Sequence, residues 1–169
     1  MKPQPLVCFA HGKESGPWGT KITRLAEVAR ARGFAVLSPD YSHTHDPKER
    51  VAHLLRLAPQ GAPLVLVGSS MGGYVSAMAC AALKPQGLFL MAPALYFPGW
   101  DEEPAGCPAI AAVIHGWNDD IVPVERGIAY ARRNGAALHV LNSGHTLNDQ
   151  LPALALVFDD LLQRTLKAS

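Results

Sequence analysis

Six apolar runs of strand length alternate with helical patterns along this chain of 169 residues, and this alternation limits the folds open to it. The runs lie at residues 5–10, 34–38, 63–67, 87–91, 109–114 and 137–141. Strands buried on both faces read as continuous apolar runs, and parallel strands need a crossover helix between them. We therefore predict an α/β fold, a three-layer α/β/α sandwich with about six parallel strands.

The second helical pattern has the clearest start signal. Asp46 can cap the helix, Pro47 fits its first position, and Glu49 would complete a capping box. The apolar face expected behind this start consists of Val51, Leu54, Leu55 and Ala58. We expect the helix to begin at Pro47 and to bury that face.

Composition narrows the class of protein. With 49% hydrophobic and 17% charged residues, the chain can form one packed domain over residues 1–169. A net charge of +1 gives no electrostatic reason to expect nucleic acid or an anionic membrane as partner. No apolar stretch approaches membrane-spanning length and no secretory signal is recognisable, so we expect a cytoplasmic protein. The three cysteines are too widely spaced for a disulfide framework or a zinc site.

The segment Gly68-Ser69-Ser70-Met71-Gly72 carries the main chemical signal. It follows the apolar run at 63–67 and precedes an alanine-rich helical pattern. A Gly-x-Ser-x-Gly between strand and helix is typical of a nucleophile elbow, a strained turn that lifts the serine hydroxyl above the sheet. The pattern therefore predicts Ser70 as a nucleophile, while Ser69 is expected to hydrogen-bond the local backbone.

Three other strand ends complete the pattern. The first run is followed by His11-Gly12-Lys13, the fifth by residues 115–123 with the sequence HGWNDDIVP, and the sixth by Asn142-Ser143-Gly144-His145. A serine, an acid and a histidine thus follow predicted strands in that order. In these motifs the sequence resembles the α/β-hydrolase superfamily, and residues 115–123 resemble the acid loop of small esterases and dienelactone-hydrolase-like members. The resemblance covers nearly the whole chain.

The resemblance implies a Ser-Asp-His triad of Ser70, Asp119 and His145. His145 would act as the general base, and Asp119 would orient it. Asp120 is the immediate rival for the acid, but the family pattern places the acid four residues after the histidine of the His-Gly pair, which selects Asp119. Six runs would correspond to the last six strands of the family's eight, a reduced α/β-hydrolase fold.

An oxyanion hole needs two donors placed before the reaction. We expect one to be the backbone N–H of Met71, after the nucleophile, and the other the N–H of Lys13, in the loop after the first strand. Gly12 would allow the close backbone approach. His11 and His115 are expected to form hydrogen bonds that fix their loops.

Large aromatic residues follow several strand ends, where ligands bind in open α/β sheets. Candidate substrate contacts are His11, Gly12, Trp18, Tyr96, Trp100 and Trp117; packing under loops is the alternative for each aromatic side chain. The irregular stretch Ala94–Pro108 falls where larger members of the superfamily carry a cap, and it is too short to form a cap domain.

The leading hypothesis is a carboxylesterase-like serine hydrolase that cleaves an ester, thioester or related acyl bond of a small molecule through an acyl-enzyme. Acyl transfer or peptide cleavage by the same triad, and a non-catalytic binding module on the same scaffold, remain alternatives. Nucleotide binding by the Gly68–Gly73 loop ranks last, because the loop lacks the phosphate-binding spacings. No metal and no organic cofactor is expected, and the sequence leaves the oligomeric state open.

Overall fold

The computed structural model describes residues 3–169 and contains one six-stranded sheet in which every neighbouring pair of strands is parallel. The strands follow one another across the sheet in the order β2-β1-β3-β4-β5-β6. Their bounds are Leu6–Ala10, Ala35–Leu37, Leu64–Ser69, Gly87–Met91, Ile110–Gly116 and Ala137–Leu141 for β1 to β6. The predicted α/β fold with about six parallel strands is confirmed.

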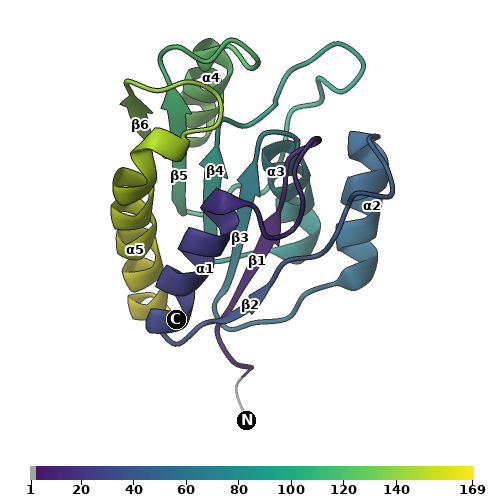
Figure 1. Cartoon of the computed structure of the whole chain (residues 1–169). Helices are drawn as coiled ribbons and strands as arrows, with labels where there is room; N and C mark the ends of the chain where they lie inside the picture. Colours follow the sequence, from purple (N-terminus) through teal and green to yellow (C-terminus); the bar gives the residue numbers. More distant parts are fainter. Residues whose placement is uncertain (1–2) are drawn as a thin grey trace.

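Within residues 3–169, five α-helices enclose this sheet. They are α1 (Thr20–Ala31), α2 (Pro47–Leu57), α3 (Met71–Leu83), α4 (Val124–Asn134) and α5 (Leu151–Lys167), with a short 3₁₀ turn at Asn148–Gln150. The helices α1 and α5 pack together on one face, and α2, α3 and α4 lie on the other (Figure 1). The result is the three-layer α/β/α sandwich that the alternating pattern predicted.

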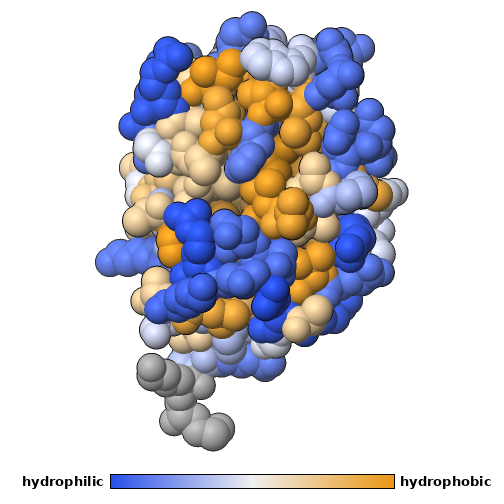
Figure 2. Space-filling view, turned by 90° about the vertical axis from the view of Figure 1, so that its left-hand side faces the viewer, coloured by the Kyte–Doolittle hydropathy of each residue, from blue (hydrophilic) through white to orange (hydrophobic). Residues whose placement is uncertain are grey.

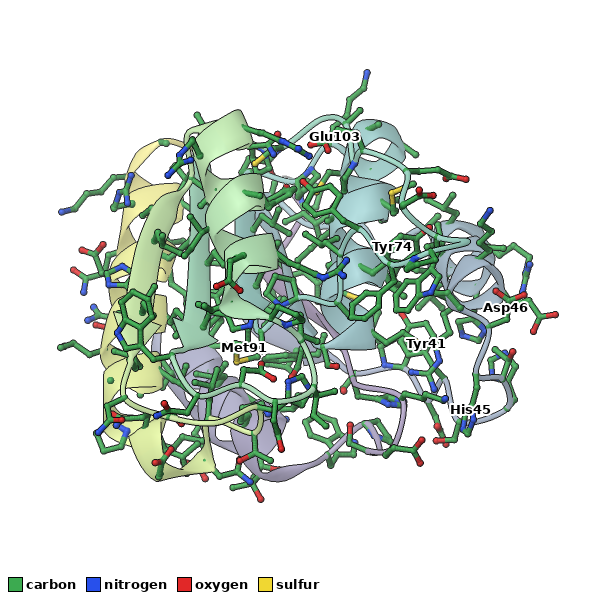
Figure 3. The ribbon with its side chains drawn as sticks, turned by 90° about the horizontal axis from the view of Figure 1, so that it is seen from above. Tyr41, His45, Asp46, Tyr74, Met91 and Glu103 are labelled. Carbon is green, nitrogen blue, oxygen red and sulfur yellow. The ribbon has the colours of Figure 1, made fainter. Side chains whose placement is uncertain are left out.

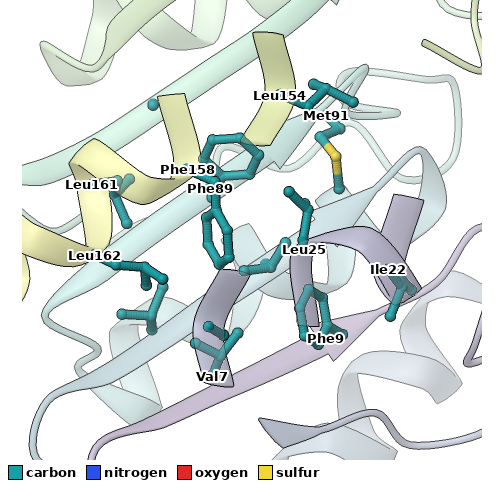
Figure 4. Close-up of a cluster of buried hydrophobic side chains, with 14 of the residues drawn as sticks. Val7, Phe9, Ile22, Leu25, Phe89, Met91, Leu154, Phe158, Leu161 and Leu162 are labelled. Atoms are coloured by element: carbon teal, nitrogen blue, oxygen red, sulfur yellow. The ribbon is translucent and has the colours of Figure 1, made fainter. Parts of the chain in front are cut away.

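Each face of the sheet has its own apolar core. Between the sheet and the pair α1 and α5, the aromatic ring of Phe158 packs against Phe89 and Phe9, with centroid distances of 5.0 and 6.5 Å (Figure 4). On the other face, Leu66, Leu88 and Tyr74 belong to the second core and are almost fully buried. Burial on both faces explains why the strands read as continuous apolar runs.

The start of α2 agrees with the prediction, but two of its details were wrong. Asp46 caps the helix through Oδ1, which accepts the Lys48 N–H at 2.9 Å. Glu49 does not close a capping box: its carboxylate accepts a hydrogen bond from the Thr44 hydroxyl instead. Of the expected apolar face, Leu55 and Ala58 are exposed, and a charged residue, Arg50, is fully buried on this helix.

The last strand, β6, forms one edge of the sheet. Its first two residues, Ala137 and Leu138, are exposed, as is Leu156 on helix α5. Figure 2 shows this side of the molecule, where apolar surface gathers in the upper half among hydrophilic side chains. None of the helices formed by residues 3–169 has both the length and the apolar character needed to cross a membrane.

Candidate active site

The three candidate triad residues meet above the carboxyl ends of the strands. Ser70 follows β3, Asp119 follows β5 and His145 follows β6. Figure 3 looks down on this edge of the molecule, with His45 and Asp46 beside α2 and Glu103 in the loop before β5. Parallel strands bring their carboxyl ends to one edge, so residues far apart in the sequence converge there.

Ser70 occupies the strained turn between β3 and α3. Its backbone has φ 54° and ψ −119°, a conformation that costs a non-glycine residue free energy. The two flanking glycines are required by close approach, since a Cβ on Gly72 would collide with the carbonyl of Ala10, and one on Gly68 with the backbone of Gly72. The nucleophile-elbow geometry thus depends on small residues two positions either side of the serine.

Hydrogen bonds link the three side chains in series. His145 Nε2 lies 3.0 Å from Ser70 Oγ, and His145 Nδ1 lies 2.8 Å from Asp119 Oδ2. The Asp119 side chain is fully buried, whereas that of His145 is 20% exposed. With the proton on Nδ1 donated to Asp119, Nε2 is free to accept the serine proton.

Asp119 is held as a carboxylate by four donors. Its Oδ1 accepts the N–H groups of Ile121 and Val122, at 2.9 and 2.8 Å. Burial opposes ionisation, but the hydrogen bond from His145 and the two backbone amides outweigh it and hold the pKa of Asp119 below its ordinary value. The rival acid, Asp120, is exposed and makes none of these contacts.

His115 is the fourth donor to Asp119. Its Nε2 lies 3.1 Å from Asp119 Oδ2 and 3.0 Å from the carbonyl of Val122, so Nε2 carries the proton. Its Nδ1 has no partner among the described residues and packs against Gly127 of α4, where a Cβ would overlap the ring. Burial lowers the pKa of His115, which keeps the ring neutral. The expected loop-fixing role agrees with these contacts, but the direct bond to the acid was not foreseen.

Two residues that line the cleft beside Ser70 have backbone N–H groups available as donors. The N–H of Met71 lies at the start of α3 and therefore has no partner within the helix. In the loop after β1, the N–H of Gly12 donates to Ser15 Oγ at 3.0 Å, which leaves the N–H of Lys13 as the available donor. Both Met71 and Lys13 line the cleft.

A buried arginine that the sequence pattern did not predict fixes this loop. Arg50 Nη1 donates to the carbonyls of His11 and Gly12 at 3.2 and 3.0 Å, and Nη2 lies 3.5 Å from that of Lys13. The C=O and N–H of a trans peptide point in opposite directions. Because the Gly12 carbonyl points at Arg50, the Lys13 N–H points away from it. Arg50 lies within an apolar helical pattern, and an arginine side chain is normally expected at the surface. The sequence therefore gave no reason to predict its burial.

His11 is also fully buried and fixes the same loop. Its Nδ1 donates to the carbonyl of Gly12 at 2.8 Å, and its Nε2 accepts the N–H of Tyr41 at 2.9 Å. Both ring nitrogens are therefore occupied by backbone partners. This arrangement agrees with the expected loop-fixing hydrogen bonds, and it leaves His11 without a free nitrogen for a substrate.

The cleft in front of Ser70 has a volume of about 690 Å³. Of the predicted substrate contacts, Gly12 and Trp100 line it, while Trp18, Tyr96 and Trp117 do not. Trp18 and Trp117 are 50% and 59% exposed, and they lie beyond its walls. The apolar wall is formed by Met71, Ala94, Phe97, Trp100, Ile121 and Val122.

The loop 94–108 carries the aromatic part of that wall and is fixed at several points. The rings of Phe97 and Trp100 stack at 5.0 Å, and the guanidinium of Arg126 lies 4.3 Å from the Phe97 ring while donating to the carbonyl of Leu95. Further along, Arg133 pairs with Glu103 at 2.9 Å. The predicted absence of a cap domain is confirmed, and the loop is a fixed wall of the cleft.

Metal ligands are not gathered at this site or elsewhere in residues 3–169: no group of three or more His, Cys, Asp or Glu side chains could hold a metal ion. The donor set beside Ser70 consists of a hydroxyl, an imidazole and a carboxylate already bonded to one another, which suits nucleophilic catalysis.

Comparison with known proteins identifies the class. The model of the alpha/beta hydrolase family matches residues 9–166, and the chain belongs to that family. A protein of the α/β-hydrolase superfamily from Xanthomonas campestris pv. campestris is 33% identical, with 95% of this chain and 99% of that chain covered and a TM-score of 0.84.

Two more distant structures share the fold. Est1E from Butyrivibrio proteoclasticus is 17% identical, with 99% of this chain and 90% of that chain covered and a TM-score of 0.85. An α/β serine hydrolase without a lid, from Xanthomonas campestris, is 23% identical, with coverage of 96% and 83% and a TM-score of 0.69. A search of curated protein sequences found no match.

Proposed function

We propose that this α/β hydrolase is a serine hydrolase that cleaves an ester, thioester or related acyl bond of a small molecule. The observation that carries the proposal is the series of two hydrogen bonds through His145, 3.0 Å to Ser70 and 2.8 Å to Asp119. A serine hydroxyl is a weak nucleophile until an adjacent base takes its proton, and this geometry supplies the base and its orienting acid. A binding module would have no use for the strained backbone at Ser70.

In the proposed reaction, Ser70 Oγ attacks the acyl carbon while its proton moves to His145 Nε2. The carbonyl electron pair moves to the oxygen, whose charge is stabilised by the N–H groups of Met71 and Lys13. Collapse of this intermediate breaks the bond to the leaving group, which takes the proton from His145. Water then repeats the sequence on the acyl-enzyme and releases the acid and free Ser70.

The wall of the cleft favours an apolar acyl group. Phe97 and Trp100 present stacked rings beside the nucleophile, and burial of apolar surface against them contributes about 25 cal/mol per Å². Est1E, which shares the fold, has been solved with ferulic acid bound. An aromatic ester therefore belongs beside short aliphatic esters among the first test substrates.

Labelling with a fluorophosphonate probe tests the proposal directly. The probe phosphonylates an activated serine, so we expect one label per chain on Ser70, identified by peptide mass spectrometry, and hydrolysis of p-nitrophenyl acetate. Ser70→Ala should lose both signals while retaining the far-UV circular dichroism spectrum. Ser76→Ala, a buried serine of α3 outside the site, is the matched control and should keep both. An unlabelled, inactive wild-type protein would contradict the proposal.

A further inference from the structure

A second, smaller cavity adjoins the cleft on the side of α1. It has a volume of about 290 Å³, and it is lined by the first turn of α1. Ser15, Lys21, Ser69 and Thr146 line both cavities. The proposed hydrolysis uses none of the side chains of these four residues for chemistry, so their arrangement calls for a separate explanation.

Lys21 places a positive charge in the wall that the two cavities share. Its Nζ donates to the carbonyl of Thr146 at 2.6 Å. Within residues 3–169, no carboxylate lies within 4.0 Å of this ammonium. Burial lowers the pKa of Lys21, and the more distant charge of Asp119 opposes that shift. A partly buried ammonium with one carbonyl partner and no carboxylate beside it can bind an anion through its remaining N–H groups.

Ser69 adds a hydroxyl that has no hydrogen-bond partner among residues 3–169 and opens into the cavities. The residue is only 9% exposed and lines both cavities. The expected hydrogen bond between its side chain and the local backbone is absent from the bonds made by residues 3–169, so that prediction was wrong. Ser69 is therefore a donor available to a molecule in this space.

The start of α1 provides further donors. The helix begins after Gly19, has no side-chain cap, and has no acidic residue in its first turn. The N–H groups of a first turn lack partners within the helix, and the positive end of the helix dipole favours an anion. Glu14, the only acidic residue lining either cavity, is exposed and lines the main cleft alone.

We propose that the second cavity is a subsite for an anionic group on the substrate, a carboxylate or a phosphate, held by Lys21, Ser69 and the first turn of α1. This inference rests on the proposed hydrolase function. Lys21 donates a hydrogen bond to the carbonyl of Thr146, the residue after His145. In the proposed reaction, His145 returns its proton to the leaving group. The anion is accordingly carried by the leaving-group part of the ester.

Matched esters test the subsite. The neutral substrate is methyl 4-acetoxybenzoate, and the two anionic substrates are 4-acetoxybenzoate and 4-acetoxyphenyl phosphate. We expect the wild type to prefer at least one anionic ester, judged by kcat/KM relative to the neutral ester. Lys21→Met should lower that preference about tenfold, the size expected for one charge-assisted hydrogen bond. Ser69→Ala should lower the preference about threefold. Whichever anionic ester is the better substrate shows whether the subsite binds a carboxylate or a phosphate.

Arg24→Met is the control, because Arg24 lies one turn further along α1 and is exposed in an ion pair with Glu27. This variant should leave the preference unchanged. If Lys21→Met and Arg24→Met lower the preference equally, the effect comes from the overall positive charge of α1, and the proposed subsite is wrong. An unchanged preference in Lys21→Met would also overturn it.

A binding measurement separates failure of the subsite from failure of the hydrolase function. In the Ser70→Ala background, 4-hydroxybenzoate or 4-hydroxyphenyl phosphate should bind more tightly than methyl 4-hydroxybenzoate in calorimetric titration, and Lys21→Met should abolish the difference. Binding that depends on Lys21 without hydrolysis by the wild type would retain the subsite and reject the function. Hydrolysis by the wild type, together with binding that does not depend on Lys21, would retain the function and reject the subsite.

Discussion

Asp119 Oδ2 accepts hydrogen bonds from two imidazoles, His145 at 2.8 Å and His115 at 3.1 Å. The first histidine faces Ser70, and the second is fully buried behind the carboxylate. The Asp119 carboxylate is thus held by one imidazole at the cleft and by another in the protein interior. This arrangement makes its position sensitive to residues that never contact a substrate.

Replacing Asp119 by Asn should reduce kcat by several orders of magnitude, because the amide can no longer orient His145 or stabilise its protonated form. Asp120→Asn should change kcat less than threefold, since this neighbour is exposed. The measurement is steady-state hydrolysis of p-nitrophenyl acetate. If Asp120→Asn lowers kcat more than Asp119→Asn, the triad acid is Asp120 and not Asp119.

His115→Phe should lower kcat by roughly ten- to a hundredfold, the range expected for one hydrogen bond to a charged group. Gly127→Ala should act in the same direction, because its new Cβ would displace the His115 ring. KM should change little in both variants. A neighbouring change on α4, Glu125→Ala, is the control for damage to the helix; if it lowers kcat as much as Gly127→Ala, the effect does not pass through His115.

Arg50→Lys should weaken stabilisation of the transition state, because an ammonium cannot reach three successive carbonyls as the guanidinium does. We expect kcat to fall about tenfold or more. The affinity for a trifluoromethyl ketone inhibitor, which forms the tetrahedral adduct, should fall in parallel, while KM is preserved. Arg56→Lys on the exposed side of α2 should be neutral. Loss of substrate binding with unaltered kcat would contradict this role.

Stability should decrease on acidification between pH 7 and pH 5. Burial lowers the pKa of His11 and His115 in the folded protein. The unfolded chain then binds protons first as the pH falls below about 6.5, so protonation favours unfolding by up to about 1.4 kcal/mol per pH unit for each histidine. Urea unfolding at several pH values should show this slope, and His115→Gln should make it shallower.

Acyl-chain preference should stop rising at short chains. A cleft without a cap can bury only a few methylenes, each contributing about 0.8 kcal/mol. We expect the gains in kcat/KM for p-nitrophenyl esters to stop at acyl chains of roughly two to six carbons. No activation at a lipid interface is expected, because the loop 94–108 is already fixed by Arg126 and Arg133. A continued rise to palmitate would require a deeper acyl tunnel.

The fold could be predicted because its signals are local. Apolar runs between helical patterns define parallel strands, and the elbow between β3 and α3 needs only a short motif that is visible in the sequence. The order of Ser70, Asp119 and His145 after three strands indicated that they would meet, since parallel strands share one carboxyl edge.

Other features depended on partners far away in the sequence. The burial of Arg50 follows from carbonyls of the loop after β1, which no helical pattern on α2 can reveal. Whether an aromatic residue after a strand reaches the cleft depends on the path of its loop, and for this reason Trp100 lines the cleft while Trp117 does not. The free hydroxyl of Ser69 likewise reflects what surrounds the turn.

The fixed loop above the cleft also has a kinetic consequence. Its aromatic pair is held by a cation over one ring and by hydrogen bonds to the loop backbone, so we expect the entrance to keep its shape when a ligand arrives. Association should then proceed in a single step whose rate rises linearly with ligand concentration, without the plateau that a gating motion imposes. Selectivity among ligands would be expressed in how fast they leave.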